Sequence, residues 1–201
     1  MKNKSFHPIL LCAASLMFSH SAKGSDYWWD SNTNTSGFGN TTGTWGSSAF
    51  WSGSSAGTAT PTAAVTGSLD TVNFGTATLS YANIAVAVAS GGVTVNSIVY
   101  GAGQGTAITL GTAGNSITLA GTTPTITVNN TAPSAAQLIS SPILGSAGFT
   151  KAGNGTLSLS GANSYTGGTS VSAGILSFRN TGSKSSGSGT HAFSSGTTLG
   201  L

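Results

Sequence analysis

The chain has little charge, no glutamate and a single cysteine, and these scarcities exclude several classes of site. Because Cys12 is the only cysteine, the chain has neither an internal disulfide framework nor a Cys-rich zinc site. Charged residues make up 4% of the sequence, against ~25% in an average globular domain. Without glutamate, and with few histidines, the sequence offers no ligand set for a metal. We therefore predict neither a metal nor a cofactor.

Residues 1–24 have the three-part layout of a secretory signal peptide. Lys2 and Lys4 precede an apolar run at residues 9–18, and small residues around Ala22 and Gly24 follow it. The apolar run is too short to span a bilayer, which needs ~20 residues. We expect cleavage after Ala22 or Gly24, which makes the remaining chain an exported protein.

Removal of this segment leaves a chain without net charge. The remaining bases are Lys151, Arg179 and Lys184, and the acids are Asp26, Asp30 and Asp70. A nucleic-acid surface requires clustered basic residues, and binding to anionic lipid requires the same. The sequence therefore predicts no nucleic-acid partner and gives no support for a membrane-surface role.

Residues 25–69 are rich in aromatic residues set among Asn, Thr, Ser and Gly. This composition favours a small cap of two or three short strands joined by turns. Its tryptophans, Trp28, Trp29, Trp45 and Trp51, have two interpretations. They fill the core of the cap, or they contact a ligand by stacking on sugar rings.

Residues 70–179 alternate apolar and small polar residues, which is typical of β-strands. The segments AITL, SITL and TITV begin at Ala107, Ser116 and Thr125, nine residues apart, with Gly or Pro between them. Each piece is too narrow to bury its apolar face alone, so stacking in a parallel β-helix is favoured. Windings of ~20–25 residues give four or five windings. Residues 180–201 are a Gly/Ser-rich continuation.

The stretch GFTKAGNGTLSLSGANSYTGGTSVSAGILSF, at residues 148–178, resembles the autotransporter-associated β-strand repeat. The matching positions are Lys151, Gly153, Gly155, Leu157, Leu159, Gly161, Asn163, Tyr165, Gly167, Gly168, Val171, Gly174 and Leu176. The resemblance implies an all-β, right-handed parallel β-helix, exported by a Gram-negative bacterium to the cell surface, outer membrane or medium. It also implies adhesion to host or neighbouring cells or to glycans, and a translocator β-barrel. Because the sequence contains no region of that size, we expect it to be an N-terminal fragment.

Two other functions stay open. Asp26 and Asp30 flank Trp28 and Trp29, as in a carbohydrate-binding or polysaccharide-acting site, where hydrolysis needs two carboxylates. A small outer-membrane β-barrel also fits the length. A Ser-His-Asp triad would depend on His191, which has no acid nearby in the sequence. The main expectation is a structural and adhesive segment that is not an enzyme.

Overall fold

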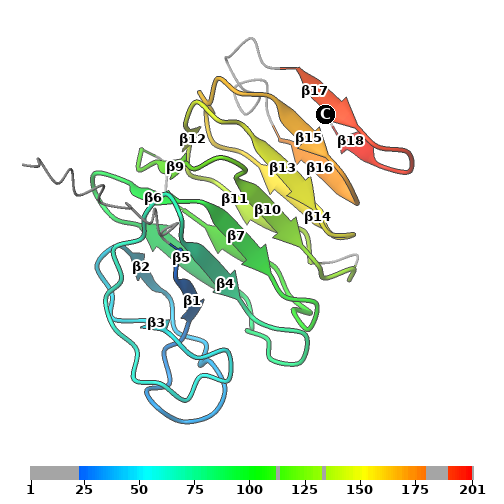
Figure 1. The fold of residues 1–201 in the computed structure, drawn as a ribbon. Helices are drawn as coiled ribbons and strands as arrows, with labels where there is room; N and C mark the ends of the chain where they lie inside the picture. The colour runs from blue at the N-terminus through cyan, green and yellow to red at the C-terminus, as the bar shows by residue number, and fades with distance from the viewer. Residues whose placement is uncertain (1–22, 112–113, 133–134, 180–189, 201) are drawn as a thin grey trace, which may run out of the picture.

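The computed structural model describes residues 23–111, 114–132, 135–179 and 190–200, and all its regular elements are β-strands (Figure 1). Within these ranges no helix is long and apolar enough to cross a membrane. The predicted signal peptide, apart from Lys23 and Gly24, and half of the Gly/Ser-rich continuation lie outside the described residues.

The strands form three sheets, named A, B and C here. Sheet A contains β1 (Asp26–Trp29), β3 (Trp51–Ser52), β4 (Thr71–Phe74), β7 (Ser97–Tyr100), β10 (Thr125–Val128), β13 (Phe149–Ala152), β15 (Thr169–Val171) and β17 (His191–Phe193). Sheet B contains β2 (Gly43–Trp45), β5 (Ile84–Val88), β8 (Ile108–Leu110), β11 (Gln137–Ile139), β14 (Thr156–Leu159), β16 (Ile175–Phe178) and β18 (Thr198–Gly200). Sheet C contains β6 (Val93–Val95), β9 (Ile117–Leu119) and β12 (Ile143–Leu144).

The chain visits the sheets in turn, which makes the fold a β-solenoid. Except for the antiparallel pair β1 and β3, the paired strands of the described residues are parallel. Five windings lie between β4 and β16, as the sequence predicts. Their register residues on sheet A are Thr71, Ser97, Thr125, Thr150 and Ser170. The numbering gives winding lengths of 26, 28, 25 and 20 residues, close to the expected length.

The nine-residue repeat runs around one winding of the solenoid. Ile108 lies in sheet B, Ile117 in sheet C and Ile126 in sheet A, and all three side chains are fully buried. Three copies of nine residues therefore complete about one circuit. Each copy supplies one side of the winding, with its Ile turned inward.

Residues 77–81 lie in the range where alternation of apolar and polar residues predicts β-strands, but they form no strand. The chain turns after β4, where the amide of Thr76 donates to the carbonyl of Leu79. Tyr81 then lies in the core and its hydroxyl donates to the carbonyl of Trp29. The apparent alternation at Ala77, Leu79 and Tyr81 belongs to a corner loop.

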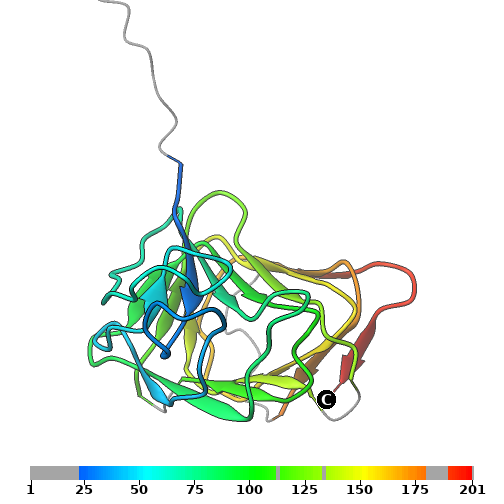
Figure 2. The ribbon, with the colours of Figure 1, turned by 90° about the horizontal axis from the view of Figure 1, so that it is seen from below.

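The N-terminal strands occupy one end of the stack. β1 and β3 end sheet A, and β2 ends sheet B. Figure 2 shows the blue-to-cyan N-terminal segment lying across that end of the windings. Aromatic rings fill the interior beneath it, including Trp29, Trp51 and Phe74, which contact one another.

Candidate functional site: the outer face of sheet A

Two registered rows of side chains run along the outer face of sheet A, and each row gains one residue per winding. The first, called the hydroxyl row here, is Thr71, Ser97, Thr125, Thr150 and Ser170. The second row is Asn73, Val99, Thr127 and Ala152. All are half-buried, because neighbours in the row cover their flanks while the outer surface stays open. In parallel sheets, adjacent members of a row are ~4.8 Å apart.

The hydroxyl row is uncharged and partly hydrogen-bonded within itself. The Oγ1 of Thr125 lies 2.9 Å from the Oγ of Ser97. Because hydroxyl groups both donate and accept hydrogen bonds, the row suits a neutral polar partner.

Asp26 and Trp28 continue the two rows at the N-terminal end of the face. Asp26 is in register with Thr71, and Trp28 is in register with Asn73. Asp26 is exposed and Trp28 is half-buried. Both line a shallow hollow of about 470 Å³ with Lys23 and Gly53. β1 thus places Asp26 and Trp28 on the same face as the hydroxyl row.

The other three predicted ligand-contact tryptophans lie inside the molecule. Trp29, Trp45 and Trp51 are 0–1% exposed. The ring of Trp51 packs edge-on against Trp29 at 5.1 Å and against Trp45 at 5.6 Å between centroids. These rings fill the cap, and of the four only Trp28 presents a surface to a ligand.

Asp30 is separated from the surface hollow that holds Asp26. Its side chain is fully buried, and burial raises the pKa of its carboxyl group. Asp26, by contrast, is exposed. The two acids therefore do not face a common surface, which a two-carboxylate hydrolytic site requires.

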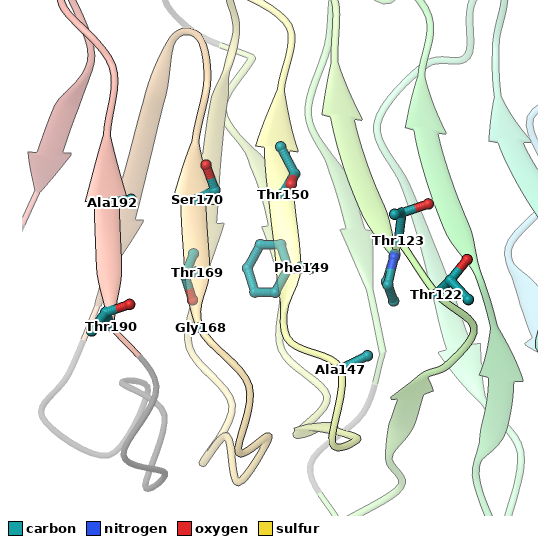
Figure 3. A pocket seen from close by; sticks show the side chains of 11 residues that line it. Thr122, Thr123, Ala147, Phe149, Thr150, Gly168, Thr169, Ser170, Thr190 and Ala192 are labelled. Atoms are coloured by element: carbon teal, nitrogen blue, oxygen red, sulfur yellow. The ribbon is translucent and has the colours of Figure 1, made fainter.

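A second hollow, of about 280 Å³, lies at the other end of the same face, over β13, β15 and β17 and beside the residues that precede β10 (Figure 3). Its lining residues are Thr122, Thr123, Pro124, Ala147, Phe149, Thr150, Gly168, Thr169, Ser170, Thr190 and Ala192. None of these lining residues is ionisable. Phe149 is registered with Thr169 of the next strand, whose Oγ1 lies 2.8 Å from the hydroxyl of Tyr165. The hollow thus combines small hydroxyl groups with a largely buried aromatic ring.

The repeat residues identified from sequence supply much of the interior of these windings. Leu157, Leu159, Val171 and Leu176 are all fully buried. Asn163 accepts the amide of Ile143 through its Oδ1, at 2.8 Å. These residues link neighbouring windings, so their roles in this structure are in packing and pairing.

Lys151 occupies an inward position of sheet A, between Ile126 and Val171. It is fully buried, and its Nζ donates to the carbonyls of Ala152, Gly153 and Ala173 at 2.7–3.1 Å. Burial lowers the pKa of the ammonium group to about 8. Since Ala173 belongs to the following winding, this cation links two successive corners of the solenoid.

Sequence reasoning missed the buried amides at other corners. Gln137 is an inward residue of sheet B; it accepts the amide of Ile108 at 2.8 Å and donates to the carbonyls of Thr106 and Ala135. Gln104 accepts the amide of Tyr81 in the same way. The alternation of Gln137 with the buried Ile139 was the available signal.

The described residues contain no group of three or more His, Cys, Asp or Glu side chains placed to hold a metal. The hydroxyl row and the hollow beside Phe149 present mainly neutral polar groups on the outer face of sheet A.

Residues 149–178 match the passenger-associated-transport-repeat. The chain is 36% identical over 169 residues to the adhesin BmaC autotransporter of Brucella suis biovar 1, across 83% of this chain and 4% of that protein. The chain thus spans a small part of the length of this relative. No solved structure matches the chain significantly. The resemblance predicted from the sequence is confirmed: residues 149–178 are a passenger-associated-transport-repeat, in a chain related over most of its length to an autotransporter adhesin.

Proposed function

We propose that this chain is a non-catalytic segment of an exported passenger at the cell surface, and that it contributes to adhesion through the outer face of sheet A. The observation that carries the proposal is the alignment of Trp28, the hydroxyl row and the Phe149 hollow on one face. The relationship to an adhesin autotransporter supports the same role. The partner class is a neutral glycan of a host or neighbouring cell surface.

The chemistry of the face supports this partner class. A neutral glycan presents hydroxyl groups that pair with Thr and Ser, and its apolar ring faces stack on aromatic side chains such as Trp28. A strongly charged partner would leave its charge without a counterpart along the rows. The long, shallow geometry suits many weak contacts along an extended chain, because both hollows described on this face are open to solvent.

The test is binding of the purified chain, coupled to beads, to cultured cells and to a panel of neutral and acidic glycans. Thr150→Arg places a long charged side chain within the hydroxyl row, and Trp28→Ala removes the half-buried outward ring. We expect each to reduce binding at least tenfold. Thr109→Arg is the matched control, because Thr109 is a half-buried outward residue of sheet B.

Equal binding by Thr150→Arg and Thr109→Arg would place adhesion elsewhere on the molecule. Absence of binding to every cell and glycan, with the fold intact by circular dichroism, would contradict an adhesive role for this segment.

A further inference from the structure

Two buried oxygen atoms in the cap loop after β1 have no hydrogen-bond partner. They are Oδ2 of Asp30 and Oδ1 of Asn32. The Asp30 side chain is 0% exposed, and it also lines a hollow of about 130 Å³ beside Phe50 and Pro61. Unpartnered buried oxygens are rare in folded proteins, because each loses its water without replacement. Two such atoms, two residues apart, point to a bound cation that is coordinated by oxygen atoms.

The backbone around Asp30 holds the carboxylate in place. Its amide donates to the carbonyl of Phe50 at 2.7 Å, and its Oδ1 accepts the amide of Asn32 at 3.0 Å. One carboxylate oxygen is therefore used within the loop. The other, Oδ2, is fixed and available.

A third oxygen lies close to Asp30 Oδ2. A Cβ atom built on Gly57 would stand 3.2 Å from Asp30 Oδ2 and 1.8 Å from the carbonyl oxygen of Gly37, so these two oxygens are separated by no more than the sum of those distances. Ligands on opposite sides of a calcium ion are ~5 Å apart, since each lies 2.3–2.6 Å from the ion. The Asn32 side chain also lies near Gly37, because its Nδ2 would be 3.5 Å from a Cβ atom built on that glycine.

We propose that Asp30, Asn32 and the carbonyl of Gly37 form a calcium site that holds together the cap loop after β1. Carboxylate, amide and backbone carbonyl oxygens are the ligands that calcium takes, and water completes its shell. The order Asp30, Asn32, Asn34 also places oxygen-bearing side chains at alternate positions, as in the first half of calcium-binding loops.

The sequence expectation of no metal rested on the scarcity of Cys, His and Glu. A site made mainly of neutral oxygens has no such signature. With one carboxylate, its affinity falls in the weak range of extracellular calcium modules, with Kd of ~10⁻⁴–10⁻³ M.

The experiment measures Tm of the purified full chain in EDTA, in 10 mM Ca²⁺ and in 10 mM Mg²⁺, with calcium affinity from isothermal titration calorimetry. We expect calcium to raise Tm by about 3–6 °C when its concentration is ten times Kd, and magnesium to raise it less. Terbium luminescence sensitised by the adjacent Trp29 provides a direct probe of occupancy.

Asp30→Asn distinguishes two explanations of the buried Asp30 side chain: a carboxylate that binds calcium, and a carboxyl group that is simply protonated and neutral. It removes a buried acid, so it should match or exceed the wild-type Tm in EDTA, and it should lose at least nine-tenths of the calcium response. Asn32→Ala should weaken calcium binding while keeping the carboxylate. Asp26→Asn is the matched control, because Asp26 begins the strand that precedes Asp30 and has an exposed side chain, and it should respond to calcium as the wild type does.

An unchanged wild-type Tm together with no calorimetric signal for calcium would overturn the proposal. So would a full calcium response in Asp30→Asn. The site goes beyond the proposed adhesion, and its readouts do not depend on cell or glycan binding, so the two proposals fail separately.

Discussion

Between residues 26 and 52 the interior is filled by Trp29, Trp45 and Trp51, whereas between residues 149 and 178 most inward positions hold Leu, Val or Phe. The cap joins its short strands through irregular loops and closes one end of the stack. The repeat winding instead stacks on a similar winding at each side. Packing in the cap therefore depends on a few large rings, and packing in the repeat depends on close backbone approach.

This difference follows from the neighbours each region has. A winding inside the stack receives matching strands on both sides, so one or two small apolar residues per strand complete its interior. The end of a solenoid has a neighbouring winding on one side only, so large side chains must cover its open core. Large aromatic side chains bury 150–250 Å² each and supply that cover with few residues.

Replacement of a cap ring should have the largest effect. Trp51→Ala removes a 1%-exposed ring that contacts Trp29, Trp45 and Phe74, so it should lower the free energy of unfolding by about 3–5 kcal/mol. Urea unfolding followed by tryptophan fluorescence measures it, because all four tryptophans lie in residues 25–69. Trp28→Ala, on the half-buried outward ring, should cost under about 1 kcal/mol. Equal losses for the two variants would contradict the assigned role of the buried rings.

Addition of one methyl group should break the repeat winding. A Cβ on Gly148, whose φ is 68°, would lie 2.0 Å from the carbonyl oxygen of Gly168 in the next winding. Gly148→Ala should therefore cost about 2–3 kcal/mol, through a backbone clash and strain at positive φ. Hydrogen exchange of amides in residues 149–178 should report the loss. Gly105→Ala is the control, since no atom lies within 4 Å of its Cβ position; a similar loss there would refute the close-approach explanation.

Lys151 should give the repeat a pH dependence of smaller size. Its pKa is 10.5 when unfolded and about 8 when folded, so the unfolded chain binds more protons between these values. The free energy of unfolding should therefore rise with pH from about 8, by at most ~1.4 kcal/mol per pH unit. Tyr81 and Tyr100 have raised pKa values and oppose this rise above pH ~10, so urea unfolding between pH 7 and 9.5 is the test.

The control for this pH dependence is Lys151→Met, which removes the titrating group and keeps a long side chain. Its unfolding free energy should change less with pH over the same range. A rise of the same slope in Lys151→Met would assign the effect to another group.

The sequence predicts the repeat region better than the cap. Alternation and turn spacing identify the inward Ile and Leu of each strand, because every winding repeats the same environment. Lys151 has the same parity as Phe149 in β13 and is therefore inward, but its charge suggests an exposed position. Its hydrogen-bond partners are three backbone carbonyls, which no residue pattern reveals.

The cap residues are harder to place because irregular loops decide which side of a ring is covered. Trp28 and Trp29 are adjacent in sequence, yet one faces outward and the other is buried. The parity within β1 settles their directions only once the pairing of Trp28 with Asn73 is known. For the same reason, the burial of Asp30 depends on Phe50 and Gly57, which are distant in sequence.

The register of the windings has a consequence for evolution by duplication. Each complete winding is paired with the winding before it and the winding after it. Duplication of a segment of one winding therefore moves everything beyond it by one strand spacing, ~4.8 Å, without new packing elsewhere. It also adds one member to each outer row. The number of binding groups and the reach of the molecule thus increase together, in equal steps, by a single kind of genetic event.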